Sequence, residues 1–154
     1  MEPIIKRIFQ ICVVTADVKA MMERYEKHYG IGGWKFIDGE KGFPPEDKAV
    51  NLKTRGIPGN YEISIATASV GDIEIELIQP LDDVSDYAIF LKEKGEGIHH
   101  VCLEADNERM AKKMEERGIP ELISGTIPGA VRFVYYDATP DLGFTFEMLG
   151  EPDL

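Results

Sequence analysis

Four polar side chains at matching places in the two halves of the sequence could bind one metal ion. Gln10 lies in the apolar stretch FQICVV and His100 in HHVCLE, while Glu76 lies in IEIELI and Glu147 in FTFEML. An imidazole, an amide and two carboxylates suit Zn, Ni, Co, Mn or Fe, with coordination positions left open for water or substrate. Two carboxylates also neutralise a divalent cation. The residue types therefore predict a metal site formed by Gln10, Glu76, His100 and Glu147.

The matching places come from an internal repeat, and a repeat of this kind decides the fold. FQICVVTAD aligns with HHVCLEADN, and IEIELI aligns with FTFEML. Each half shows a strand, a helix and a further set of strands, with the helices in VKAMMERYEKHY and ERMAKKMEER. We predict a single α+β domain over residues 1–154, built from two tandem βαβββ modules, residues 4–80 and 97–150. Their strands are expected to form a curved mixed sheet around a metal cleft.

Strand alternation predicts which face the two glutamates occupy. Side chains in a strand point alternately to the two faces, so Ile75 and Leu77 share one face and Glu76 lies on the other. Phe146 and Met148 leave Glu147 on the opposite face in the same way. The apolar faces are expected to pack under the helices, and the acidic faces are expected to line the concave side of the sheet.

Residues 38–60 separate the helix of the first half from its closing strands. This stretch is rich in Gly, Pro and charged residues, which is typical of an irregular segment. Irregular segments of this length in compact domains are usually functional. We therefore predict a long excursion over residues 38–60 that contacts the substrate.

Other chemistry-bearing side chains have simpler interpretations. Cys12 and Cys102 occupy equivalent positions in the repeat, and we interpret them as small buried filler rather than as thiolate ligands. His99 is next to His100 in the strand and therefore points to the opposite face, which favours a packed or capping role. His28 falls on the polar side of the first helix and is expected to be solvated.

The composition of the chain limits the classes of molecule that it is expected to bind. The 154 residues carry a formal net charge of -11, which argues against binding to nucleic acid. The apolar stretch near the N-terminus is too short to span a bilayer. Two cysteines make no disulfide framework, so a cytoplasmic location is expected. Arg132 and Lys53 are candidates for contacting a phosphate or carboxylate of a small anionic substrate.

The strings GEGIHHVCLEADN, LIQPLDDVSDYAIFLKEKGEGIHH and FEML, in chain order, resemble the vicinal oxygen chelate superfamily, the glyoxalase/bleomycin resistance fold. Within it the sequence most resembles methylmalonyl-CoA epimerase and its glyoxalase-like relatives. The family's metal ligands map onto Gln10, Glu76, His100 and Glu147, although epimerases usually carry His at the position of Gln10. A Gln/Glu/His/Glu set is similar to that of some glyoxalase I enzymes.

The resemblance implies an activity and its alternatives. It implies a metal-dependent isomerase that removes the proton alpha to a carbonyl of an acyl-CoA, with Glu62 and Glu147 as bases, in a homodimer. The alternative is a glyoxalase I-type lactoylglutathione lyase acting on a hemithioacetal by similar chemistry. A third possibility is a small-molecule binding or resistance protein of the same fold without turnover.

Overall fold

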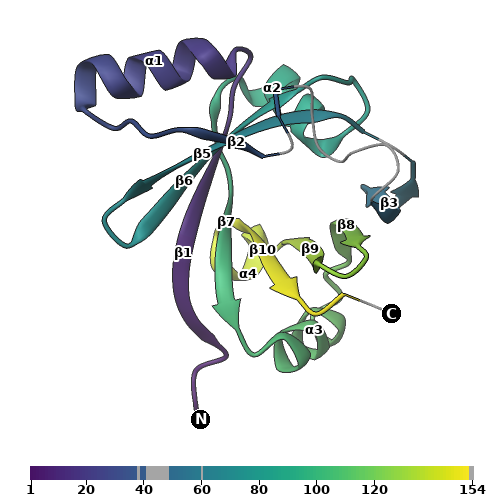
Figure 1. Cartoon of the computed structure of the whole chain (residues 1–154). Coiled ribbons are helices and arrows are strands. Elements are labelled where there is room, and N and C mark those ends of the chain that lie inside the picture. The colour runs from purple at the N-terminus through teal and green to yellow at the C-terminus, as the bar shows by residue number, and fades with distance from the viewer. Residues whose placement is uncertain (38, 41–48, 60, 153–154) are drawn as a thin grey trace. The chain divides into compact units, whose positions relative to one another are not determined.

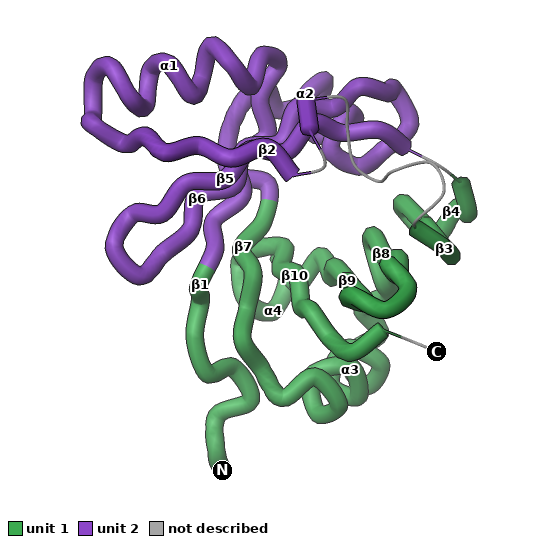
Figure 2. The backbone as a smooth tube through the Cα atoms, viewed as in Figure 1, with its two compact units in different colours: residues 1–9, 46–60, 100–154 green, residues 10–45, 61–99 purple. Residues whose placement is uncertain are grey.

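The structure is a computed structural model that describes residues 1–37, 39–40, 49–59 and 61–152. The chain divides into two compact units, shown in green and purple in Figure 2. Unit 1 contains residues 1–9, 46–60 and 100–154, and unit 2 contains residues 10–45 and 61–99. The units are described separately below.

The described part of unit 2 has a small mixed sheet together with helices α1 and α2 (Figure 1). Its sheet has the strand order β2-β5-β6-β1, in which β1 and β6 are parallel and the other neighbouring strands are antiparallel. Its complete elements are α1 (Val18–Tyr29), β2 (Lys35–Ile37), β5 (Ile63–Val70), β6 (Ile73–Pro80) and α2 (Asp86–Lys94). Two strands are shared with unit 1: β1 (Ile5–Val14) belongs to unit 2 from Gln10 onward, and β7 (Gly97–Ala105) belongs to it up to His99.

Helix α1 is fixed at both ends and along its apolar face. The Asp17 carboxylate accepts a hydrogen bond from the Ala20 N–H at 3.0 Å, which is a typical N-cap. Gly30 ends the helix in the left-handed conformation, with a φ of 69°, where glycine is the least strained residue. Val18 packs with Ala66 and Leu77 of the sheet below. The predicted burial of Leu77 under the first helix is confirmed.

Unit 1 has the strand order β7-β10-β9-β8-β3-β4, and β7 and β10 are its parallel pair. Helix α3 packs with the sheet through Met110 and Met114, which join Phe146 and Met148 in one buried cluster. The predicted apolar face of the closing strand is therefore confirmed. The elements are the first half of β1, β3 (Val50–Thr54), β4 (Ile57–Pro58), the rest of β7, α3 (Asn107–Glu116), β8 (Glu121–Ile127), β9 (Val131–Asp137), α4 (Thr139–Leu142) and β10 (Thr145–Gly150).

The stretch 38–60, predicted to be irregular, contains two strands. Strand β3 pairs with β8 and with β4, and Arg55 and Gly56 form the turn between β3 and β4 with φ values of 53° and 75°. Two positive φ values in a two-residue loop are typical of a hairpin turn, which the sequence RG signals only weakly. The irregular interpretation is therefore wrong for 50–54 and 57–58, whereas 38, 41–48 and 60 lie outside the described residues.

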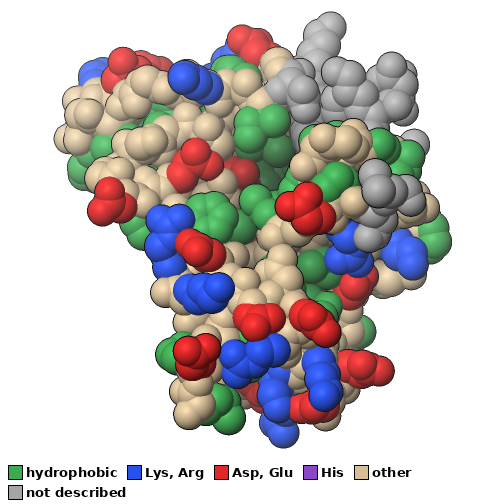
Figure 3. Space-filling model, turned by 60° about the horizontal axis from the view of Figure 1, so that its bottom comes forward, with side chains coloured by type: hydrophobic (Ala, Val, Ile, Leu, Met, Phe, Trp, Pro, Cys, Tyr) green, Lys and Arg blue, Asp and Glu red, His purple; other side chains and the backbone are tan. Residues whose placement is uncertain are grey.

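None of the helices in the described part of the chain has both the length and the apolar character needed to cross a bilayer. On the face drawn in Figure 3, acidic and basic side chains lie next to one another. Ion pairs within unit 1 include Arg7 with Glu104 at 2.7 Å and Arg117 with Asp141 at 2.8 Å. Positive charge on this face is therefore accompanied by negative charge.

Candidate functional site

In unit 1 the structure brings together His100 and Glu147, two of the four predicted ligands. Strands β7 and β10 run in parallel, and Glu147 lies in register with Cys102, two residues beyond His100 on the same face. His100 is 1% exposed and Glu147 7%. The Nε2 atom of His100 lies 3.3 Å from Oε2 of Glu147. The imidazole also packs against the Tyr135 ring, with 4.5 Å between the ring centroids, which fixes its plane.

In unit 2 the other two predicted ligands lie on the parallel strands β1 and β6. Gln10 and Glu76 are both buried, with exposed fractions of 8% and 7%. Gln10 Nε2 donates a hydrogen bond to Oε1 of Glu74, its partner in the β1–β6 register, at 2.7 Å. Glu76 lies in register with Cys12 instead, and the Cys12 sulfur is within 4.8 Å of a Glu76 carboxylate oxygen.

The two units therefore repeat one arrangement at the level of single residues. Each has a parallel pair made of an opening and a closing strand, and each pair sets a cysteine opposite the closing-strand glutamate: Cys12 with Glu76, and Cys102 with Glu147. The position two residues before the cysteine is Gln10 in one unit and His100 in the other. The sequence alignment of the halves thus corresponds to the observed strand registers.

The remaining predicted residues lie away from these pairs. Glu62 is exposed just before β5, where its backbone N–H donates to Oδ2 of Asp82 at 3.1 Å. Lys53 is exposed on β3. Arg132 on β9 forms an ion pair with Glu121 at 3.0 Å. Alternation along β9 sets Arg132 on the face opposite Tyr135, so Arg132 does not share the face of the His100 ring.

His99 has the packed role predicted for it. Its Nε2 lies 2.8 Å from Oδ2 of Asp86, and its ring contacts those of Tyr87 and Phe90, with centroid distances of 4.9 and 5.1 Å. Asp86 and Tyr87 belong to α2, a helix that the sequence analysis does not anticipate. The signal that could have indicated it is Ser85, which caps the helix by accepting a hydrogen bond from the Ala88 N–H. His28 is exposed on α1, as predicted.

Comparison with known proteins establishes the family. Residues 9–136 match the Glyoxalase/Bleomycin resistance protein/Dioxygenase superfamily. The chain belongs to this superfamily. The predicted resemblance is confirmed, as is the predicted fold class, an α+β chain with a mixed sheet and few helices.

Relatives within the superfamily include methylmalonyl-CoA epimerases, which are enzymes. The mitochondrial epimerase of Bos taurus is 42% identical over 52 residues, which cover 33% of this chain and 30% of that protein. The match thus spans about a third of the curated relative. The epimerase of Mycobacterium tuberculosis has a TM-score of 0.66 at 18% identity, covering 100% of this chain and 93% of that one. A Streptomyces coelicolor epimerase, solved in complex with 2-nitronate-propionyl-CoA, has a TM-score of 0.63 at 18% identity, covering 94% of each chain.

The donor set of this superfamily member fits a divalent metal ion. A carboxylate is costly to bury unless it is paired or coordinates a metal, and in the described part of each unit a buried glutamate lies beside a second donor group. The second donors are the imidazole of His100 in unit 1 and the thiol of Cys12 in unit 2, whereas the Gln10 amide donates to Glu74. Carboxylate oxygen, imidazole nitrogen and thiolate sulfur are all ligands of zinc and cobalt.

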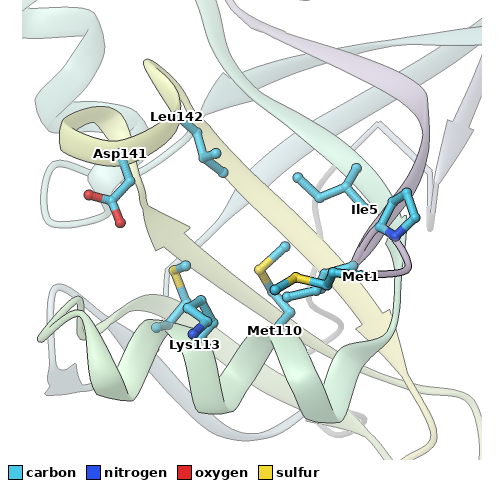
Figure 4. A pocket seen from close by; sticks show the side chains of 9 residues that line it. Met1, Ile5, Met110, Lys113, Asp141 and Leu142 are labelled. Carbon is cyan, nitrogen blue, oxygen red and sulfur yellow. The ribbon is translucent and has the colours of Figure 1, made fainter.

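A cavity of about 360 Å³ lies elsewhere in unit 1 (Figure 4). Its walls come from the N-terminal segment, α3 and α4, and they include Met110, Met114 and Leu142. Lys113 and Asp141 also line it, and each of these forms an ion pair with another residue, Glu116 and Arg117 respectively. The cavity is mainly apolar, and the predicted site residues are not among those that line it.

Proposed function

We propose that this superfamily member is a metal-dependent epimerase, similar to methylmalonyl-CoA epimerase, that inverts the carbon alpha to the carbonyl of an acyl-CoA thioester. The observation that carries the proposal is agreement between two comparisons: methylmalonyl-CoA epimerases are found both by sequence and by fold. The repeated pairing of a buried glutamate with a second donor group supports it independently.

The proposed ligands are Gln10 and Glu76 from unit 2, and His100 and Glu147 from unit 1. A bound Zn, Ni, Co or Mn ion would supply Lewis-acid stabilisation of the negative charge that develops on the thioester oxygen. The two glutamates balance the double positive charge of such an ion. The packing of the His100 ring against Tyr135 limits the rotation of the imidazole.

The proton is proposed to be moved by two carboxylates, Glu62 and Glu147. One carboxylate removes the alpha proton, and the other returns a proton to the opposite face of the same carbon, so no net atoms are gained or lost. Glu62 is suited to the role of a base because its side chain is exposed, while its backbone N–H and C=O groups are both hydrogen-bonded. Its N–H donates to Asp82, and its carbonyl accepts from the Leu81 N–H at 2.8 Å.

The epimerase relatives support an acyl-CoA as the proposed substrate class. An acyl-CoA carries phosphates, and Lys53, exposed on β3, offers a cation to bind one of them. Arg132 is proposed for the same role, and binding a phosphate would replace its ion pair with Glu121. We further propose that the protein works as a homodimer in the cytoplasm, which size-exclusion chromatography and fractionation would test.

The test is proton exchange at the alpha carbon in heavy water. The protein is loaded with Co²⁺ or Zn²⁺, incubated with methylmalonyl-CoA in D₂O, and the deuterium content of the acyl group is followed by mass spectrometry. We expect exchange together with inversion, and loss of both on chelation. No exchange by the loaded protein, with consumption of methylglyoxal plus thiol, would instead establish the glyoxalase I reaction. A preparation that takes up no metal and turns over neither substrate would indicate a binding protein.

Variants separate the two bases. Glu62→Gln is expected to stop inversion, while Glu147 still exchanges the proton of one epimer. Glu147→Gln is expected to reduce both exchange and metal affinity, with a rate loss of about 10²–10⁴-fold from the missing base alone. Glu104→Gln is the matched control, since Glu104 is an exposed glutamate on β7 that pairs with Arg7. Wild-type rates in Glu62→Gln and Glu147→Gln would refute the assignment of the bases.

A further inference from the structure

Cys12 sets a thiol beside the Glu76 carboxylate within unit 2. The two residues are in register on parallel strands, and the sulfur lies within 4.8 Å of a carboxylate oxygen. A sulfur and an oxygen bound to one zinc, at about 2.3 Å and about 2.1 Å, can be separated by about 4.4 Å at most. A separation within 4.8 Å is therefore close to what two ligands of one zinc ion require. Cys12 is 0% exposed and forms no disulfide.

Of the donors on β1, a Cys12 thiolate would be stronger than the Gln10 amide. The Gln10 amide nitrogen donates to Glu74 at 2.7 Å, so this amide is oriented by Glu74. In unit 1 the equivalent strand supplies an imidazole, and its Nε2 lies 3.3 Å from the Glu147 carboxylate. A neutral amide oxygen is a weaker ligand for zinc or cobalt than a thiolate is. The Cys12 thiol is thus the metal-binding group beside the buried glutamate in unit 2, as the His100 imidazole is in unit 1.

We infer that Cys12 binds, as a thiolate, the cation held by Glu76, and that it makes the site selective for Zn²⁺ and Co²⁺ over harder ions such as Mn²⁺ and Mg²⁺. The inference rests on the metal site of the proposed function and adds a ligand to it. A thiol that coordinates a metal is deprotonated, and soft thiolate ligands select against ions that prefer oxygen.

The experiment is a Co²⁺ titration of the intact protein, followed by optical spectroscopy. Thiolate coordination gives Co²⁺ an intense near-ultraviolet charge-transfer absorption that oxygen and nitrogen ligands do not give. We expect this band in the wild type. Cys12→Ser should abolish it and weaken Co²⁺ binding by at least about tenfold, since even outer partners of a ligand are worth about 10–100-fold. Cys102→Ser is the matched control, because Cys102 is equally buried and lies in register with Glu147.

The outcomes separate this inference from the proposed function. Co²⁺ binding without the band in the wild type, or a band that survives Cys12→Ser and is lost in Cys102→Ser, would overturn the role of Cys12 and leave the proposed function standing. A protein that binds no Co²⁺, Zn²⁺ or Ni²⁺ would overturn both. X-ray absorption of the zinc-loaded wild type needs no variant, and it should show one sulfur at about 2.3 Å; its absence would equally refute the inference.

Discussion

Gly125 in β8 is the position where one added methyl group should do most damage. A Cβ built on Gly125 would lie 2.5 Å from Cζ of Phe133 and 2.6 Å from Cδ2 of Leu52. Both neighbours are buried, with exposed fractions of 5% and 6%. Carbon atoms pack at about 3.5–4.0 Å, so an alanine requires each neighbour to retreat by about 1 Å. The neighbours lie on the adjacent strands β9 and β3, and neither can swing into solvent.

The expected cost of Gly125→Ala follows from these distances. Overpacking a closed site costs about 1–3 kcal/mol, and the entropy that alanine recovers in the unfolded chain offsets about 0.5–1 kcal/mol of this. The free energy of unfolding should therefore fall by about 1–2 kcal/mol. For a chain of this size that corresponds to a decrease in Tm of about 2–8 °C. Differential scanning calorimetry and urea unfolding would measure both quantities.

Two controls make the prediction specific. Gly97→Ala adds a methyl group where no atom lies within 4 Å, so Tm should stay or rise slightly. Phe133→Leu removes the atom closest to the new methyl, so Gly125→Ala should cost at least about 0.5 kcal/mol less in that background. Equal Tm values for Gly125→Ala and Gly97→Ala, or strict additivity with Phe133→Leu, would refute the steric reasoning.

Three further predictions concern buried and paired polar groups. The Ser64 hydroxyl is buried without a hydrogen-bond partner among the described residues, so Ser64→Ala should raise the free energy of unfolding by about 1 kcal/mol, measured in urea; a loss of stability would show a hidden partner. The hydrogen bond from the Thr15 hydroxyl holds the pKa of Glu96 below its usual value, so its stabilisation is present above the ordinary pKa of about 4.5 and disappears as the pH falls through the lowered value. Glu96→Gln should therefore flatten the acid side of the pH–stability curve, and an unchanged curve would contradict this. Asp86→Ala removes a partner from the buried His99 ring and should lower the free energy of unfolding by about 1–3 kcal/mol in the same assay, whereas a neutral result would mean that this pair adds nothing.

Strong periodicity made most of the fold predictable. The alternation of Ile75 and Leu77 around Glu76 holds because one face of β6 packs under α1. Helix α2 was missed for a physical reason: Tyr87 to Leu91 are five consecutive apolar residues, which fit a short buried strand as well as a helix. Strand β3 was missed because its pairing depends on β8, some 70 residues later in the chain, and a local pattern carries no such information.

The sequence predicted the strands on which the candidate ligands lie, but not the groups that these side chains contact. The repeat predicted that His100 and Glu147 belong to one site, and the structure has their side chains 3.3 Å apart. The sequence could not show that Gln10 donates to Glu74, because the direction of an amide depends on which side chains surround it. Arg132 was chosen for its charge alone, and alternation along β9 sets it on the face opposite Tyr135.

The duplicated strand pair explains why the two units can carry different donors at equivalent positions. The strand register determines only the positions of the Cα atoms. It is the same in both units, with a cysteine opposite a glutamate on parallel strands. The donor two residues earlier is free to differ, and it is an amide that donates to Glu74 in unit 2 and an imidazole beside Glu147 in unit 1. If the imidazole is a ligand, Cys102 is not needed for metal binding and only fills space in the core. In unit 2 the amide nitrogen donates to Glu74, so Gln10 offers a metal only its neutral amide oxygen, and a Cys12 thiolate would bind a soft cation more strongly. The two cysteines should therefore respond differently to the same substitution.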